Sequence, residues 1–206
     1  MLDSGQIEQA AAKIQKGGCI IYPTETLYAL GGNALNPEAA AKVCRLKSRP
    51  RGKPLPVIIG NIEQLFLLTE CNIQEFYGLL DNFWPGPLSI LVPGKEELPL
   101  EIRDSGGMVC VRWSSSNISQ QLCLCSAVPL IASSANRDGE SPPLIPLDLD
   151  PGLKQQVDHV LTREEEDGTS MPSTIVRILD RSGLKVIRQG AVSNEDLEQA
   201  GYTLFS

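Results

Sequence analysis

NPEAAAKVCRLKSRPRGKPLPVII, residues 36–59, joins a helix to a strand through a basic loop. Asn36 followed by Pro37 is a typical helix start, because an Asn side chain accepts bonds from free backbone N–H groups and proline has no N–H to satisfy. Apolar residues then recur with helical spacing, at Ala39, Ala40, Val43, Cys44 and Leu46. The apolar run 55–59 follows the loop at once and predicts a buried strand. A helix that leads directly into a buried strand indicates an α/β fold.

Further helices and strands are expected along the chain. Apolar residues spaced from Ile7 to Ile14 predict a helix that ends at Gly17, and residues 19–22 predict a buried strand. Asn61 and Asn72 each precede a Gln or Glu by three residues, the spacing of a capping box, so short helices are expected there. Strands are expected at residues 88–92, 108–112, 129–132, 157–161, 174–179 and 184–187, with a helix over 118–125 and a last helix capped by Ser193 and Asp196.

The order of these elements predicts the fold class. Helices and strands alternate early in the chain, and strands crowd together later. We therefore expect an α/β fold, a single domain over residues 1–206 with a twisted mixed sheet of parallel and antiparallel strands flanked by helices. Residues 141–152 have the composition of a loop, and we interpret them as a movable flap.

The composition is that of an ordinary globular protein, with 206 residues, a formal net charge of -7 and a hydrophobic fraction of 42%. No run approaches the roughly 20 apolar residues that span a bilayer, and the first residues lack a signal segment. We therefore expect a cytoplasmic protein without membrane contact. The six cysteines form no CxxC pair and the one histidine is His159, which argues against a structural metal site and against Ser-His-Asp chemistry.

A basic loop stands out in this acidic chain. Six of the 18 basic residues lie between positions 42 and 53, where no carboxylate occurs: Lys42, Arg45, Lys47, Arg49, Arg51 and Lys53. Two explanations fit this run, a solvated loop or a binding site for an anion. Two prolines and a glycine stiffen the loop, and fixed cations suit recognition better than mobile ones. We expect exposed cations whose replacement leaves the fold intact. The net negative charge argues against a general nucleic-acid coat, while transient contact of the loop with RNA stays open.

Two polar segments follow buried strands, and each has two interpretations. Ser133-Ser134-Ala135-Asn136 comes after an apolar strand, where ligands of α/β sheets commonly bind, but it also fits a turn with local side-chain bonds. Residues 22–31, YPTETLYALG, are likewise either part of a site or a capped turn. Neither a Walker A sequence nor GxGxxG occurs, so the candidates for anion binding are the basic loop, these serines with Asn136, Arg112 and Arg188.

Together these segments resemble the YrdC family over nearly the whole chain. Seven motifs in the family's order carry the resemblance: Tyr22-Pro23-Thr24-Glu25-Thr26 with Tyr28 and Gly31; Lys47-Ser48-Arg49-Pro50 with Lys53-Pro54-Leu55; Trp84-Pro85-Gly86-Pro87-Leu88-Ser89; Val109-Cys110-Val111-Arg112; Ser134-Ala135-Asn136; Ser173-Thr174-Ile175-Val176; and Arg188 with Gly190. The best-defined members of the family are threonylcarbamoyl-AMP synthases. The resemblance therefore implies a YrdC-like fold and nucleotidyltransferase activity.

The implied reaction joins L-threonine, bicarbonate and ATP into L-threonylcarbamoyladenylate and releases pyrophosphate. Its product supplies the threonylcarbamoyl group of t6A in tRNAs that read codons beginning with A. Such a reaction calls for cations and hydroxyls that hold three anionic partners, and it needs no covalent nucleophile. Mg²⁺ is expected to accompany ATP. The resemblance also leaves room for transient contact with tRNA and with the threonylcarbamoyl transferase machinery.

The resemblance implies a role for each matching residue. Lys47 and Arg49 would be catalytic and would face triphosphate and carbamate oxygens. The threonine-binding side would be formed by Thr26, Arg112 and Ser173. The ATP-binding side would be formed by Arg49, Lys53, Ser134, Asn136 and Arg188.

Two segments depart from the family's pattern at the rim of the expected pocket. Many relatives have His-Pro after Arg112, where this chain has Trp113-Ser114-Ser115-Ser116-Asn117. Residues 164–168, EEEDG, replace a short glycine-containing turn and predict an exposed acidic loop. The chain resembles the single-domain form of the family, without the additional C-terminal domain of longer relatives. Two alternatives to the synthase stay open: a noncatalytic RNA-binding module of the same fold, and a paralogue that adenylates a different carbamate.

Overall fold

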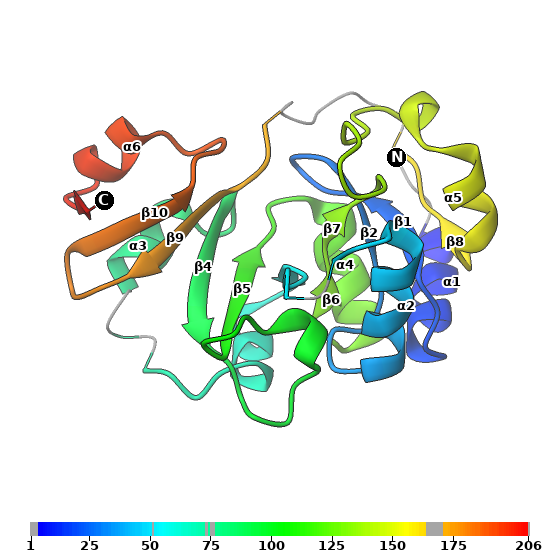
Figure 1. Cartoon of the computed structure of the whole chain (residues 1–206), viewed down its shortest axis with the longest axis horizontal. Coiled ribbons are helices and arrows are strands. Elements are labelled where there is room, and N and C mark those ends of the chain that lie inside the picture. Colours follow the sequence, from blue (N-terminus) through cyan, green and yellow to red (C-terminus); the bar gives the residue numbers. More distant parts are fainter. Residues whose placement is uncertain (1–3, 51, 73, 75–76, 164–170, 206) are drawn as a thin grey trace.

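Two β-sheets with helices packed around them form the fold (Figure 1). The computed structural model of the chain describes residues 4–205 apart from 51, 73, 75–76 and 164–170. The smaller sheet has the strand order β7-β2-β1-β8, and the larger one has the order β11-β10-β9-β4-β5-β3-β6. In the larger sheet β3 pairs with β5, β4 with β9 and β10 with β11 in parallel, while the other neighbours are antiparallel. The predicted mixed α/β architecture is confirmed.

The bounds of the elements are as follows. The strands are β1 Ile20–Pro23, β2 Tyr28–Gly31, β3 Val57–Ile59, β4 Leu88–Pro93, β5 Met108–Trp113, β6 Leu130–Ile131, β7 Ser133–Ser134, β8 His159–Val160, β9 Thr174–Ile178, β10 Gly183–Arg188 and β11 Thr203–Phe205. The helices are α1 Ser4–Gln15, α2 Pro37–Lys47, α3 Tyr77–Phe83, α4 Asn117–Ser126, α5 Pro151–Gln156 and α6 Asn194–Gln199. Three 3-10 helices are η1 Ile62–Leu67, η3 Leu100–Ile102 and η4 Pro146–Asp148.

Helix α2 begins and ends as its sequence predicts. The side chain of Asn36 accepts bonds from the backbone N–H groups of Glu38 at 2.8 Å and Ala39 at 3.1 Å. At the other end Ser48 adopts a left-handed conformation with φ 52°, and its N–H donates to the carbonyl of Arg45. The helix therefore stops at Lys47, and the basic loop starts directly after it.

Several predicted elements differ from those observed. The turn at Asn61 continues as the 3-10 helix η1 rather than an α-helix. The helix expected from Asn72 is α3, which begins at Tyr77, and Glu75 lies outside the described residues. The strand expected over 157–161 is limited to His159–Val160. Helix α5 occupies part of the tract 141–152 that we interpreted as loop, because Asp150 caps it and Pro151 opens it. Strands β2 and β11 were not predicted.

The strand predicted over 129–132 is limited to β6, and a second short strand, β7, follows it in the other sheet. Strand β6 pairs with β3 in the larger sheet, and β7 pairs with β2 in the smaller one. Ala132, between them, donates its backbone N–H to the carbonyl of Pro56. The chain thus crosses from one sheet to the other at this point, and the polar residues after Ile131 lie where the two sheets meet.

The core is built on both sides of the larger sheet. A first cluster joins α2, both sheets and α6, and a second cluster packs Ile7, Ala10 and Ile14 of α1 against Leu122 and Cys123 of α4. No helix in the described part of the chain has the length and apolarity that crossing a membrane requires.

Gly31 lies where β2 passes closest to β6. A Cβ at this position would lie 1.6 Å from the carbonyl oxygen of Ile131. The same oxygen accepts a bond from the Tyr22 hydroxyl at 2.7 Å. Backbone crowding of this kind cannot be relieved by a rotamer change, because the atom that would be displaced is held in place by the Tyr22 hydroxyl and the strand.

We expect Gly31→Ala to destabilise the fold by roughly 1–3 kcal/mol or more, because β2 and β6 must separate to admit the methyl group. Urea unfolding followed by circular dichroism measures the change. Gly106→Ala is the control, since the nearest atom to its added Cβ is a side-chain oxygen of Asp104 at 3.3 Å rather than a backbone atom at 1.6 Å. Equal stability of the two variants would contradict this account.

Candidate active site

A cavity of about 640 Å³ opens between the two sheets, and the residues predicted for the site all line it. Its walls come from the turn between β1 and β2, the end of α2, the loop after it, strand β5, the segment after β7, and the facing ends of β9 and β10. The predicted residues that line the cavity are Thr26, Lys47, Arg49, Lys53, Arg112, Ser134, Asn136, Ser173 and Arg188. Segments that are far apart in the sequence thus contribute to one pocket.

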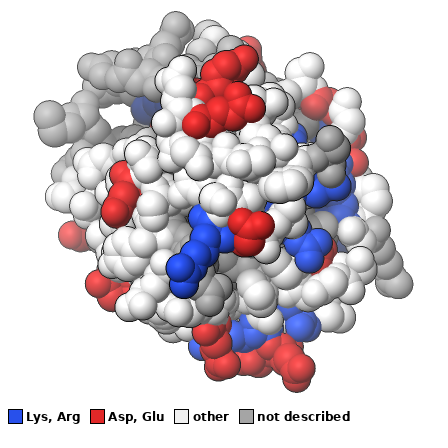
Figure 2. All heavy atoms as spheres, turned by 90° about the vertical axis from the view of Figure 1, so that its left-hand side faces the viewer, with Lys and Arg blue, Asp and Glu red and all other residues white. Residues whose placement is uncertain are grey.

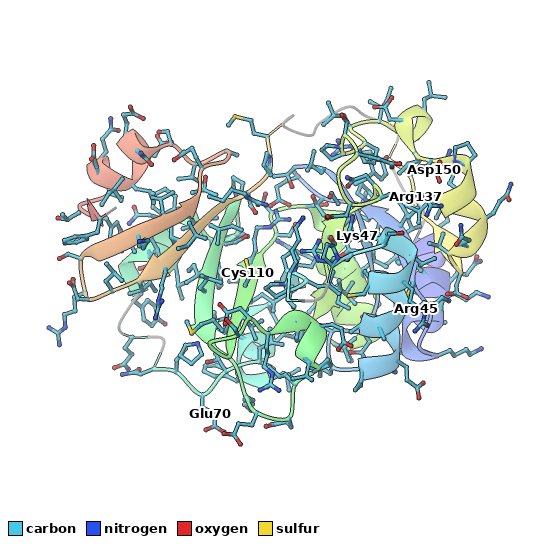
Figure 3. The ribbon with its side chains drawn as sticks, in the orientation of Figure 1. Arg45, Lys47, Glu70, Cys110, Arg137 and Asp150 are labelled. Carbon is cyan, nitrogen blue, oxygen red and sulfur yellow. The ribbon has the colours of Figure 1, made fainter. Side chains whose placement is uncertain are left out.

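Lys47 is the last residue of α2, and only 1% of its surface is exposed. Figure 3 labels this side chain, and its ammonium group donates to the backbone carbonyl of Ser134 and, at 2.5 Å, to that of Asn136. Burial, together with the neighbouring Arg49, lowers the pKa of Lys47 to about 8. The prediction of an exposed loop cation is wrong for this residue, because the helix continues far enough to carry Lys47 into the core.

Arg49 and Lys53 form the basic wall of the cavity. The half-buried guanidinium of Arg49 donates to the carbonyls of Lys53 at 2.8 Å and Pro54 at 2.7 Å, which fixes the loop around it. Burial lowers the pKa of Arg49. Lys53 is exposed and forms an ion pair with Asp138, with 2.6 Å between Nζ and Oδ1. The hydrogen bond from Lys53 holds the pKa of Asp138 below its ordinary value.

The segment after β7 brings Ser134 and Asn136 to the cavity. The amide nitrogen of Asn136 donates to the carbonyls of Arg137 at 2.9 Å and Glu140 at 2.7 Å. These are the local side-chain bonds that we expected if the segment forms a turn, and the amide nitrogen of Asn136 makes them. The amide oxygen is buried and bonds to no described residue. The amide oxygen is therefore an unpaired buried acceptor in a residue that lines the cavity.

The turn between β1 and β2 is closed by its own threonines. The Thr24 hydroxyl bonds with the Leu27 carbonyl at 2.7 Å and lies 3.0 Å from the Thr26 hydroxyl. Arg112 lies across the cavity wall on β5, with 6% of its surface exposed, and forms an ion pair with Glu25 of this turn. Burial lowers the pKa of Arg112 to about 10, so the guanidinium stays a cation at neutral pH.

Ser173 and Arg188 meet at the opposite wall. The guanidinium of Arg188 donates to the Ser173 carbonyl at 2.6 Å and to its hydroxyl at 3.2 Å. A second hydroxyl, that of Ser89, lies 2.9 Å from the Ser173 hydroxyl. Burial lowers the pKa of Arg188. Cys110 lines the same region, and burial raises the pKa of its thiol to about 11, so it is not a thiolate at neutral pH.

Sequence reasoning missed several residues that support the site. Glu25 and Tyr28 lie inside a motif that was noticed, but their contacts were not predicted. Arg163 donates to the Thr24 carbonyl at 2.9 Å, and its guanidinium carbon lies 5.7 Å from the centre of the Tyr28 ring. Asp138 and Arg163 carry no local sequence signal. The predicted acidic loop 164–168 lies outside the described residues.

Comparison with known proteins identifies the relatives of this chain. The Sua5/YciO/YrdC family model, described as "Telomere recombination", matches residues 12–190. Curated relatives named threonylcarbamoyl-AMP synthase include proteins of Pyrococcus abyssi, 36% identical over 69% of this chain and 42% of the relative, and Bacillus subtilis, 33% identical over 94% and 56%. The chain thus spans about half the length of these two. A Pseudomonas aeruginosa relative of the same name is 34% identical over 78% of this chain and 86% of its own length.

Solved structures show the same fold. Pyrococcus abyssi Sua5 complexed with L-threonine matches with a TM-score of 0.87 at 28% identity, over 100% of this chain and 60% of that one. Escherichia coli YciO matches with a TM-score of 0.79 at 23% identity, over 96% of this chain and 95% of that one, which shows the fold alone. The family model, the relatives and the shared fold agree: the chain belongs to the Sua5/YciO/YrdC family.

Proposed function

We propose that this chain is an L-threonylcarbamoyladenylate synthase, a nucleotidyltransferase that joins L-threonine, bicarbonate and ATP and releases pyrophosphate. One observation carries the proposal: five cations line a single cavity, and among the described residues carboxylates form ion pairs with two of them. Asp138 pairs with Lys53 and Glu25 pairs with Arg112. Among the described residues, no carboxylate forms an ion pair with Lys47, Arg49 or Arg188. Three cations without an ion-pair partner in the described part of the chain suit the triphosphate of ATP.

The assignment of the two substrates follows the walls of the cavity. Thr26, Arg112 and Ser173 form the threonine side, where the Arg112 guanidinium can receive the amino-acid carboxylate. Arg49, Lys53, Ser134, Asn136 and Arg188 form the ATP side. The relative solved with L-threonine and the relatives named threonylcarbamoyl-AMP synthase support this choice of substrates.

The chemistry fits a cavity with cations and hydroxyls. The threonine amine and bicarbonate give a carbamate and water, and a carbamate oxygen then attacks the α-phosphorus of ATP. The bond from that phosphorus to the bridging oxygen breaks, and pyrophosphate leaves with the electron pair. Lys47 and Arg49 are the residues that we assign to this step, because fixed cations stabilise the charge that develops on the leaving group. No covalent nucleophile takes part, so a protonated Cys110 and a distant His159 are no obstacle.

Magnesium would reach the site with ATP. The described residues contain no cluster of three or more His, Cys, Asp or Glu side chains that could hold a metal ion. Asp138 is paired with Lys53, and Glu140 accepts the backbone N–H of Arg137 at 3.1 Å. Mg²⁺ bound to the phosphates would neutralise part of their charge, as in other nucleotide enzymes. The product would then serve t6A formation in tRNA, with transient contact to tRNA and to the transferase machinery in the cytoplasm.

Pyrophosphate release tests the proposal directly. Purified protein with ATP, threonine and bicarbonate should release pyrophosphate, and omission of threonine or bicarbonate should abolish the release. Release with another amino acid instead of threonine would indicate a paralogue that adenylates a different carbamate. Tight, salt-sensitive binding of tRNA without threonine-dependent release would favour the noncatalytic RNA-binding module.

Arg49→Ala should lower kcat/KM by about tenfold to hundredfold, because a charge-assisted hydrogen bond contributes about 1.5–3 kcal/mol. The pyrophosphate assay measures the loss. The variant should stay folded, because the Arg49 side chain donates to the carbonyls of Lys53 and Pro54 in its own loop and, at the long distance of 3.4 Å, to the Ser133 hydroxyl. Arg45→Ala is the matched control. Arg45 is an exposed cation of α2 that does not line the cavity, so its removal should leave kcat/KM unchanged. Equal losses in the two variants would show that only the overall charge matters.

Binding of ATP should weaken above pH 8, because Lys47 then loses its proton. The sign follows from linkage: ATP favours the charged lysine, so its affinity falls by up to about tenfold per pH unit once the free protein deprotonates. A neutral amine keeps two N–H groups for the carbonyls of Ser134 and Asn136, so the loop stays in place. Calorimetry between about pH 7 and pH 9.5 measures the effect. In Lys47→Arg the guanidinium stays charged, and the alkaline loss should disappear.

A further inference from the structure

The side chain of Glu25 accepts two hydrogen bonds from one buried region behind the cavity wall. One carboxylate oxygen accepts a bond from Nη1 of Arg112, and the other accepts the hydroxyl of Ser114. The three side chains come from separate places: Glu25 from the β1–β2 turn, Arg112 from β5, and Ser114 from the segment after it. Arg112 lines the cavity, whereas Glu25 does not. The carboxylate therefore contacts the guanidinium without occupying the pocket.

The backbone around Glu25 is fixed on both sides. The Thr24 hydroxyl accepts the N–H groups of Thr26 and Leu27, each at 3.2 Å. The carbonyl of Pro23 accepts the hydroxyl of Ser119 at 2.9 Å. A turn that is closed by its own threonine and tied to α4 holds its carboxylate in one place.

Ser114 is fixed in the same way. Its carbonyl accepts the side-chain amide of Gln120 at 2.7 Å, and its hydroxyl accepts the N–H of Ser116 at 3.3 Å. Ser114 is fully buried. This serine belongs to the segment that departs from the family's pattern after Arg112, so here that segment supplies a hydroxyl to Glu25.

Arg112 depends on Glu25 for its orientation. The bond from Nη1 to Glu25 is the one side-chain hydrogen bond that Arg112 makes with the described residues. A guanidinium is planar and has five N–H groups, so fixing one edge sets the direction of the others. With 7% of the Arg112 side chain exposed, the remaining donors have the cavity as their accessible side.

We propose that Glu25, completed by Ser114, is a positioning residue that holds the Arg112 guanidinium with its free donors toward the cavity, where they receive the carboxylate of the amino-acid substrate. The carboxylate receptor is then a three-residue assembly rather than a single arginine. That the received carboxylate belongs to an amino acid rests on the proposed function. A purely structural counter-ion would stabilise the protein without setting the affinity for one substrate.

The first measurement reads the orientation of Arg112 without any substrate. In ¹⁵N-labelled protein, a guanidinium held at one edge gives separate Nη–H signals because rotation about Cζ–Nη is slow, and Arg112→Lys assigns them. We expect these signals in the wild type and their averaging in Glu25→Gln, while the backbone amide spectrum keeps its dispersion. Ser114→Ala, which keeps the charge pair, should broaden the same signals, and it serves as the test variant where Glu25→Gln does not fold.

The second measurement reads the consequence by calorimetry. Glu25→Gln should raise the Kd for threonine by at least about tenfold, since a misdirected guanidinium loses a charge-assisted bond. Ser114→Ala should raise it less, and both should leave the Kd for ATP unchanged. Ser115→Ala is the matched control, because Ser115 is an exposed neighbour, and it should bind threonine as the wild type does.

The outcomes separate the two proposals. An unchanged or lower Kd for threonine in folded Glu25→Gln, or Arg112 signals that stay resolved in it, would overturn the positioning role. If the wild type binds no threonine but Glu25→Gln releases the Arg112 signals, Glu25 is still the residue that positions Arg112, and the proposed synthase function fails instead.

Discussion

The bond from the Lys47 ammonium to the carbonyls of Ser134 and Asn136 holds the site together. It connects the end of α2 to the segment that leaves the smaller sheet, and both stretches line the cavity. Burial of an ammonium group costs free energy unless its N–H groups donate hydrogen bonds. If this segment moved away from α2, the Lys47 charge would be left in the core without these acceptors. Helix, loop and polar segment are therefore fixed relative to one another before any ligand binds.

The same electrostatic constraint explains why an acidic protein concentrates cations in one place. The buried and half-buried cations of the cavity lose hydration, and the lowered pKa values of Lys47, Arg49 and Arg188 express that cost. Partial compensation comes from Asp138 and Glu25. Elsewhere the charges are mixed: the face in Figure 2 shows lysines and arginines in small groups among acidic residues, without one broad basic surface. That face offers no broad basic surface to a nucleic-acid backbone, whereas the cations of the cavity suit a small anion.

The sequence predicted the parts of the site whose signal is local. Asn36 predicts the start of α2, because capping needs only neighbouring residues. The family motifs name Lys47, Arg49 and Ser134 as residues of one site before any geometry is known. The division of residues 129–134 between two sheets was not predicted, because an apolar run looks alike whichever sheet it joins. We predicted that Lys47 lies on an exposed loop. The spacing of apolar residues shows roughly where α2 ends along the sequence, but it does not show whether that end is exposed or buried in the core.

Contacts across the sequence explain the remaining gaps. Glu25 and Arg112 are 87 positions apart, and Arg163 and Thr24 are 139 apart, so neither pair leaves a periodic or short-range pattern. Glu25 alone is compatible with an exposed turn, and its role follows only from the topology that brings the β1–β2 turn to β5. Residues that support a site through another residue are therefore harder to predict than those that contact the ligand.

The fold itself does not decide the activity. YciO shares the architecture over nearly the whole of both chains at 23% identity, a level at which only the backbone arrangement is comparable. What distinguishes one family member from another is the set of side chains around the cavity and those that hold them. In this chain the segment after Arg112 changes from the family's pattern, yet Ser114 contributes a hydroxyl to the carboxylate that fixes Arg112. The departure at the rim is thus compatible with the proposed receptor, because Ser114 of the changed segment bonds to the same carboxylate that contacts Arg112.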